Sequence, residues 1–256
     1  MLLGLDVPPI DHLTNWPPFA FKDSELFALN KVGLIYLIAM ALTLAIFVIG
    51  GSKQKLVPTG IQNVAETGVE FVREQVVLQT MGNDGMVFLP YLTALFFFIF
   101  FSNIFSVIPV MQFSANARFA MPLVLALITY VIFNIVGIVK QGPLTYVKNS
   151  IVPPGVPKPI LPLVVIIELV SHFLVRPFSL MVRLFANMLA GHLILATFAV
   201  ICAAVFAKSV IIVILPFSFA LLLALTGFEI LVSFLQAFIF TILTAVYIGG
   251  SMHPEH

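Results

Sequence analysis

The fold is decided by a long apolar stretch at residues 160–207, ILPLVVIIELVSHFLVRPFSLMVRLFANMLAGHLILATFAVICAAVFA. A second stretch of 39 residues follows at 210–248, after Lys208-Ser209, the one polar break near the middle. A helix of that length extends about 58 Å at ~1.5 Å per residue, roughly twice the ~30 Å thickness of the hydrocarbon core of a bilayer. We therefore expect two long helices that cross a membrane obliquely.

The alternative for these two stretches is four ordinary spans, two in each stretch. It requires buried turns at Pro177 and at Pro216 or Gly227. We favour the long helices because neither stretch contains a cluster of the polar residues that a turn normally uses.

Composition supports a membrane protein. The 256 residues are 61% apolar and only 9% charged, whereas a soluble domain is about 45–50% apolar and about 25% charged. This excludes a soluble globular protein, a disordered chain and a protein that binds nucleic acid through a basic surface. The single cysteine, Cys202, lies in an apolar run, which argues against disulfides and thiolate metal sites.

Further uncharged runs approach or exceed the ~20 residues that a spanning helix needs. We predict one all-α membrane domain over residues 1–256, with about five crossing helices and one interfacial amphipathic helix. Its parts are an external N-terminal segment (1–31), a span (32–49), the interfacial helix (60–78), spans at 86–110 and 119–139, a cytoplasmic loop (140–159) and the tilted hairpin (160–248). The pattern at 60–78 also fits a short soluble connector helix.

Basic residues set the expected orientation. Lys53, Lys55 and Arg73 follow the first span, and further lysines follow the third. Because cytoplasmic loops are enriched in lysine and arginine, we expect these loops in the cytoplasm, the N-terminus outside and the C-terminus inside.

Arg183 is the most informative intramembrane charge, because charged side chains inside a bilayer are costly and usually functional. Its guanidinium stays protonated at any accessible pH. On a helix its face is shared by small or polar residues, namely Ser179, Ala186, Asn187 and Ala190. This pattern indicates a partner that approaches closely with its own carboxylate. A structural ion pair with Glu229 or Glu168, or snorkelling to the interface, is the alternative.

Glu168, His172 and Arg176 follow one another at four-residue spacing. A carboxylate and an imidazole one helical turn apart can pass on a proton. The alternative is a structural Glu168–Arg176 pair near the cytoplasmic interface, with Arg176 as an interface anchor.

A second polar group lies beyond Arg183. His192 is nine positions further on and so on roughly the opposite side of the helix. If the two long helices pair through the Lys208 turn, residues whose numbers sum to about 417 lie opposite each other. This register places His192 opposite Leu225, within about one turn of Glu229. It places Arg183 opposite Phe234, beside Gln236, and Ser233 falls between Glu229 and Gln236. The histidines and glutamates lack the tight spacing of a metal site.

With these residues the chain resembles subunit a of the F-type ATP synthases. The two most specific blocks are MVRLFANMLAGH at 181–192 and FLQAFIFTILTAVYI at 234–248. Supporting matches are Phe88-Leu89-Pro90, Phe101-Ser102-Asn103-Ile104 and the amphipathic segment near 57–75. Together they cover most of the chain from about residue 57 onward.

The resemblance implies roles for individual residues. Arg183 would face the essential carboxylate of the c-ring and separate two half-channels, with Gln236 beside it and Asn187 on the side that faces the ring. His192 and Glu229 would line one half-channel, and Glu168 would belong to the other. We add His172, Arg176 and Ser233 as further ion-translocation candidates from the residue pattern alone.

The resemblance further implies a non-catalytic, proton-translocating stator subunit without cofactor or metal. Its partners would be the c-ring proteolipid, peripheral-stalk b-type subunits, the rest of the ATP synthase and membrane lipids, and it would not bind nucleic acid. The expected location is the bacterial plasma membrane, with the mitochondrial inner membrane as the alternative. A secondary transporter with an anion site at Arg183 and a purely structural assembly subunit remain the competing functions.

Overall fold

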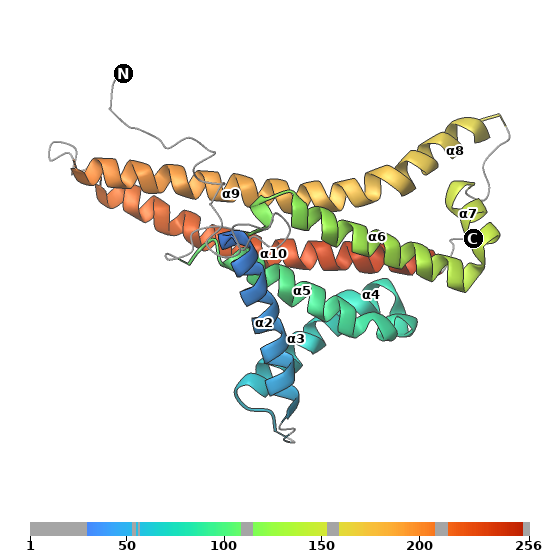
Figure 1. Ribbon diagram of the computed structural model, residues 1–256, viewed down its shortest axis with the longest axis horizontal. Coiled ribbons are helices and arrows are strands. Elements are labelled where there is room, and N and C mark those ends of the chain that lie inside the picture. The colour runs from blue at the N-terminus through green and yellow to red at the C-terminus, as the bar shows by residue number, and fades with distance from the viewer. Residues whose placement is uncertain are drawn as a thin grey trace, which may run out of the picture. The chain divides into compact units, whose positions relative to one another are not determined.

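The structure is a computed structural model that describes residues 30–52, 55, 57–108, 115–152, 159–207 and 215–252. Its regular secondary structure in these ranges is helical (Figure 1). The α-helices are α2 (Lys31–Ser52), α3 (Ile61–Val72), α4 (Leu78–Thr80), α5 (Leu89–Ile104), α6 (Ala120–Gln141), α7 (Pro143–Ile151), α8 (Leu161–Val170), α9 (Arg176–Ala207) and α10 (Leu215–Met252). Shorter turns are π-helical in η1 (Arg73–Val77) and η4 (Ser171–Val175), and 3₁₀-helical in η2 (Gly82–Phe88) and η3 (Ala115–Ala117).

Five helical segments in the described residues are long and apolar enough to cross a membrane. They are Lys31–Ser52, Gly82–Ile104, Ala120–Gln141, Leu161–Cys202 and Pro216–Met252. The predicted class, an all-α polytopic membrane protein, is therefore confirmed. The predicted N-terminal segment and the Lys208-Ser209 break lie outside the described residues, apart from Asn30 and Lys31.

The two long apolar stretches form long helices and not pairs of short spans. The chain passes from α8 through η4 into α9 without leaving a helical path (Figure 1), and α10 is a single helix of 38 residues. Of the proposed turn positions, Pro177 and Gly227 lie inside helices, and Pro216 is the second residue of α10. The π-helical turn ends at Val175, two residues before Pro177. A proline ring clashes with the carbonyl four residues earlier, here that of Phe173 within this turn, and a wider turn is one way for a helix to accommodate it.

Two predicted boundaries differ from the structure. The span predicted at 86–110 is helical from Gly82 to Ile104, and the chain turns at Phe105–Val107, just before Pro109. A proline disfavours helical geometry in the residue before it, which explains the earlier end. The loop predicted at 140–159 contains the nine-residue helix α7.

The chain forms two compact units. The first contains the described parts of Met1–Leu44, Phe98–Arg118 and Ala186–Gln236. The second contains Ala45–Phe97, Phe119–Phe185 and the described part of Ala237–His256.

Aromatic side chains pack the second unit. Phe71 on α3 lies between Phe96 of α5 and Phe238 of α10, with ring centroids 5.6 and 5.7 Å away. Phe47 of α2 meets Phe97 edge-on at 5.3 Å. Such contacts stabilise helix packing through dispersion and the electrostatics of the ring quadrupoles. Both interactions also act inside a bilayer, where the hydrophobic effect does not drive helices together.

Helix α7 folds back against α6 at a glycine. Gly142, with φ +82°, occupies a left-handed conformation between the two helices that favours glycine. One turn earlier, a Cβ atom at Gly137 would overlap the ring of Tyr146. Gly137 therefore allows the Tyr146 ring to lie directly on the backbone of α6.

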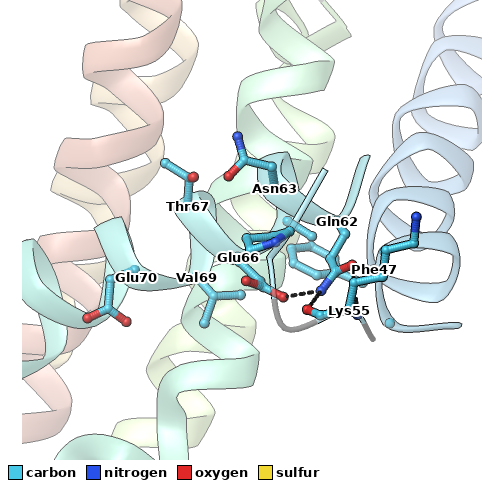
Figure 2. Close-up of a pocket in the computed structure, with 12 residues that line it drawn as sticks. Phe47, Lys55, Gln62, Asn63, Glu66, Thr67, Val69 and Glu70 are labelled. Atoms are coloured by element: carbon cyan, nitrogen blue, oxygen red, sulfur yellow. Dashed lines mark hydrogen bonds between the residues drawn. The ribbon is translucent and has the colours of Figure 1, made fainter. Parts of the chain in front are cut away.

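An open groove of about 740 Å³ lies along the end of α2 and the start of α3 in the second unit (Figure 2). Gln62 organises it. Its amide group donates to the backbone oxygen of Lys55 at 3.0 Å and to Oε1 of Glu66 at 2.7 Å, and its oxygen accepts from the Lys55 N–H at 3.2 Å. These hydrogen bonds hold the connection between α2 and α3 in place. We therefore assign the polar groups of the groove a structural role.

Candidate ion-translocation site

Glu229 is a buried carboxylate in the first unit. It lies on α10 with 4% of its surface exposed, and His192 on α9 is 7% exposed. A Cβ atom at Gly191 would lie 3.4 Å from both Cδ and Oε1 of Glu229. The carboxylate therefore rests against the backbone of α9 beside His192, and Figure 1 shows these halves of α9 and α10 running alongside each other.

Several buried polar atoms around Glu229 lack hydrogen-bond partners among the described residues. Both carboxylate oxygens of Glu229, Oγ of Ser233 and Nε2 of Gln236 belong to this group. So do Oγ of Ser106, which lies near Glu229, and Nδ2 of Asn103. Buried polar groups are almost always hydrogen-bonded, to protein or to ordered water. The interior of the first unit is therefore polar around Glu229.

A hydrogen-bonded network fixes the same interior from the other helices. Nδ2 of Asn116 donates to Oγ of Ser102 and to Oδ1 of Asn103, both at 2.7 Å. The hydroxyl of Tyr36 on α2 donates to Oδ1 of Asn116 at 3.1 Å. Tyr36, Asn116 and Ser106 were not predicted as site residues, although a polar side chain inside an apolar run is the signal that indicates such residues.

Gln236 is bonded to Asn187 in the structure. Nδ2 of Asn187 donates to Oε1 of Gln236 at 2.7 Å. The pairs Asn187–Gln236 and Gly191–Glu229 sum to 423 and 420, so the predicted register of 417 was wrong by up to about two turns. Helices that are apolar on every side contain little sequence information about register, and here the polar pair sets it.

Replacing Asn187 by leucine is expected to destabilise the first unit by about 1–3 kcal/mol, because it leaves both ends of the buried Gln236 amide unpaired. The double variant Asn187→Leu/Gln236→Leu removes the stranded amide and should recover most of that loss. Thermal unfolding in lipid nanodiscs of the wild type, Asn187→Leu, Gln236→Leu and the double variant measures the coupling energy between the two side chains. Thr197→Val, which removes a hydroxyl bonded only to its own helix at Leu193, is the control. Equal losses in the single and double variants would contradict the structural role of the bond.

Helix α9 has two different faces around Arg183. Leu184, Met188 and His192 are buried. Arg183 is half-buried, and the residues that continue its side of the helix, Ala186, Asn187 and Ala190, are exposed. Among the described residues of its own unit, Arg183 forms no ion pair. The small, polar face is thus open along two turns of the helix after the arginine.

His172 in the second unit does not bond to Glu168. It is 3% exposed, and its Nε2 lies 3.1 Å from the Tyr146 hydroxyl and 3.4 Å from Oδ1 of Asn134. Among the described residues, no hydrogen bond joins it to Glu168, and no ion pair joins Glu168 to Arg176. Neither direct contact of Glu168, with His172 or with Arg176, is therefore present among the described residues, and proton transfer between Glu168 and His172 stays a prediction. The π-helical turn at Ser171–Val175 winds more residues per turn, which changes the four-residue alignment.

Arg176 instead packs on an aromatic ring. Its guanidinium lies 5.5 Å from the centroid of the Tyr247 ring of α10, a cation–π geometry.

Comparison with known proteins decides the family. The family model described as ATP synthase A chain matches residues 33–249, which is most of the chain. The chain belongs to the ATP synthase A chain family. It is 44% identical to ATP synthase subunit a of Rhodococcus erythropolis over 251 residues, covering 94% of this chain and 88% of that protein.

Two further relatives extend the comparison. The chain is 43% identical to ATP synthase subunit a of Frankia alni over 235 residues, covering 89% of this chain and 79% of the relative. It is 37% identical to ATP synthase subunit a of Streptomyces lividans over 257 residues, covering 99% and 90%. As a member of the ATP synthase A chain family, this is a multi-pass, non-catalytic membrane-sector subunit of a proton-translocating ATP synthase.

Proposed function

We propose that this chain is the stator that guides protons through two offset half-channels to and from carboxylates on a rotating c-ring, with Arg183 between the half-channels. Moving one proton through ~100 mV is worth about 2.3 kcal/mol, so each ATP requires several protons. A ring of identical carriers that passes one fixed arginine meets this requirement.

The observation that carries the proposal is the division of α9 into two faces. Ala186 and Ala190 leave a smooth exposed strip beside Asn187 and beyond Arg183, where a helix of another subunit can approach closely. A half-buried arginine that forms no ion pair among the described residues of its own unit attracts a carboxylate that a partner brings. When that carboxylate loses its proton, the arginine stabilises it, and direct proton transfer across the arginine is disfavoured because a guanidinium cannot be deprotonated.

One half-channel follows the buried polar atoms of the first unit. Glu229, with Ser106 and Ser233 nearby, offers oxygens that lack protein partners among the described residues. His192 adds an imidazole, a group that can accept and release a proton. In this proposal Asn187 and Gln236 end the half-channel near the ring, since their mutual hydrogen bond holds the Gln236 amide in place.

The other half-channel lies on the N-terminal side of Arg183 along the chain. Glu168 is half-buried and His172 is fully buried, so this region also combines an acid with an imidazole. Following the positive-inside rule, we place the N-terminus outside and the C-terminus in the cytoplasm, which makes this second half-channel the cytoplasmic one. The c-ring proteolipid and the b-type subunits of the peripheral stalk are the proposed neighbours.

Photo-crosslinking in the assembled complex tests the proposed contact. A photoreactive phenylalanine analogue at Ala186 or Ala190 should give an adduct with a small, two-helix proteolipid that carries an intramembrane carboxylate. The same analogue at Ile135, an exposed position of α6 in the other unit, is the control and should not. Adducts with lipid alone at all three positions would contradict the stator function and favour a transporter that acts as an isolated chain.

A further inference from the structure

His172 is enclosed by aromatic and polar side chains from three helical segments. It projects from the π-helical turn η4 and is 3% exposed, whereas Phe173, the next residue, is 45% exposed. Its ring meets Phe133 of α6 edge-on, with centroids 5.4 Å apart, and lies 5.8 Å from the Tyr146 ring of α7. The imidazole therefore has a defined orientation.

The hydrogen bonds around Nε2 of His172 define where its proton lies. Nδ2 of Asn134 donates to the backbone oxygen of Tyr130 at 2.7 Å, so Oδ1 points toward the histidine. That oxygen accepts the hydroxyl proton of Tyr146 at 3.1 Å. Because the tyrosine has only one proton, a Tyr146 hydroxyl that donates to Asn134 presents a lone pair to Nε2, 3.1 Å away. Oδ1 of Asn134, 3.4 Å from Nε2, also presents a lone pair.

Both oxygens beside Nε2 can thus accept its proton. A proton on Nε2 gives each of these groups a partner, whereas a bare Nε2 and Oδ1 of Asn134 would have to share the single tyrosine proton, which leaves a buried acceptor unpaired. The hydrogen-bond partners of the two ring nitrogens decide which nitrogen of a neutral histidine carries the proton. The arrangement selects the neutral tautomer that carries its hydrogen on Nε2 and leaves Nδ1 as the base.

This arrangement is held firmly. The Tyr146 ring lies on the backbone at Gly137, where any side chain would overlap it. Nδ2 of Asn149 on α7 donates to Oε1 of Gln141 at 3.1 Å, and Nε2 of Gln141 donates to the backbone oxygen of Ser251 at 2.8 Å. Helix α7 is therefore tied to α6, and α6 in turn is tied to α10.

Other titratable and charged groups face this site from each neighbouring element. On its own helical run His172 has Glu168 one turn before it and Arg176 one turn after it, and the charge of Arg176 acts on it. From α6, Tyr130 contacts Asn134, and α7 contributes Tyr146. From α10, Tyr247 lies under Arg176 and 5.9 Å from the ring of Phe133.

We propose that Asn134 and Tyr146 lock His172 with its hydrogen on Nε2, so that Nδ1 alone takes up and releases protons in the half-channel before Arg183. The inference rests on the proposed function. A proton binds the Nδ1 lone pair to give the imidazolium and leaves from the same nitrogen, with Nε2–H unchanged. His172 is then a one-sided proton acceptor, because Asn134 Oδ1 cannot pass a proton onward. Asn134 and Tyr146 are positioning residues.

Solid-state NMR of the assembled, ¹⁵N-histidine-labelled complex in lipid reads the tautomer directly, with His172→Gln assigning the signal. We expect the neutral form to be Nε2–H in the wild type, and a mixture of tautomers in Asn134→Leu and Tyr146→Phe. Tyr91→Phe is the matched control, since it removes a hydroxyl paired with Thr129 in the same unit and should leave the signal unchanged. A wild-type Nδ1–H tautomer would overturn the lock.

Passive proton conductance of the membrane sector, measured against pH, tests the role. Asn134→Leu should lower the conductance about tenfold near neutral pH and move the midpoint of its pH profile, and Tyr91→Phe should do neither. If the wild-type sector conducts protons and His172→Gln has the same pH profile, His172 has no role in proton uptake and the proposal is overturned. Absence of conductance in the wild type would instead contradict the proposed function itself.

Discussion

Replacing Arg183 by alanine is expected to abolish ATP-driven proton pumping, by at least about 100-fold, while the ATP synthase still assembles. The guanidinium is a permanent charge at the start of an exposed strip of α9 and forms no ion pair among the described residues of its unit. Without it, a partner carboxylate loses its stabilising cation, and protons can cross directly between the half-channels. Passive proton leak should therefore rise as pumping is lost.

Inverted membrane vesicles measure both quantities through a pH-sensitive dye, with and without ATP. Arg73→Ala is the control, because Arg73 forms an exposed pair with Glu70 at 3.1 Å and such pairs contribute only ~0–1 kcal/mol. Retained ATP-coupled pumping in the Arg183 variant would rule out the stator function. Lost pumping without added leak would leave the arginine an assembly residue and contradict its role as a barrier.

Replacing Glu229 by leucine is expected to separate function from stability. The carboxyl group is 4% exposed, and neither oxygen has a hydrogen-bond partner among the described residues. Proton-driven ATP synthesis should fall by at least about 100-fold, since a titratable group in the path is lost. The thermal stability should stay equal or rise, because an apolar side chain removes a buried group whose desolvation is uncompensated.

ATP synthesis in energised vesicles and thermal unfolding of the purified complex check the two halves of this expectation. Glu74→Leu, at an exposed carboxylate, is the matched control. The double variant His192→Leu/Glu229→Leu should also block passive conductance through the membrane sector. Unchanged pumping in that variant would exclude both residues from the channel, and a large loss of stability would mean that Glu229 is structural.

The sequence by itself was sufficient for the features that depend on local geometry. Uncharged runs of about 20 residues indicated the spans because the hydrocarbon core cannot accept charges. The helical period placed Arg183 and Asn187 on one face of their helix and His192 on another. The structure has the same two faces, with Asn187 exposed and His192 buried. These properties depend only on the residues within one helix.

Only the tertiary structure decided which side chains from different helices meet. It pairs Gln236 with Asn187 and gives His172 the partners Tyr146 and Asn134 in place of Glu168. The physical reason is that a helix apolar on every side can pack in many registers with nearly equal burial. The choice among them comes from a few polar contacts and close approaches, such as that of Tyr146 on Gly137, between residues far apart in the chain.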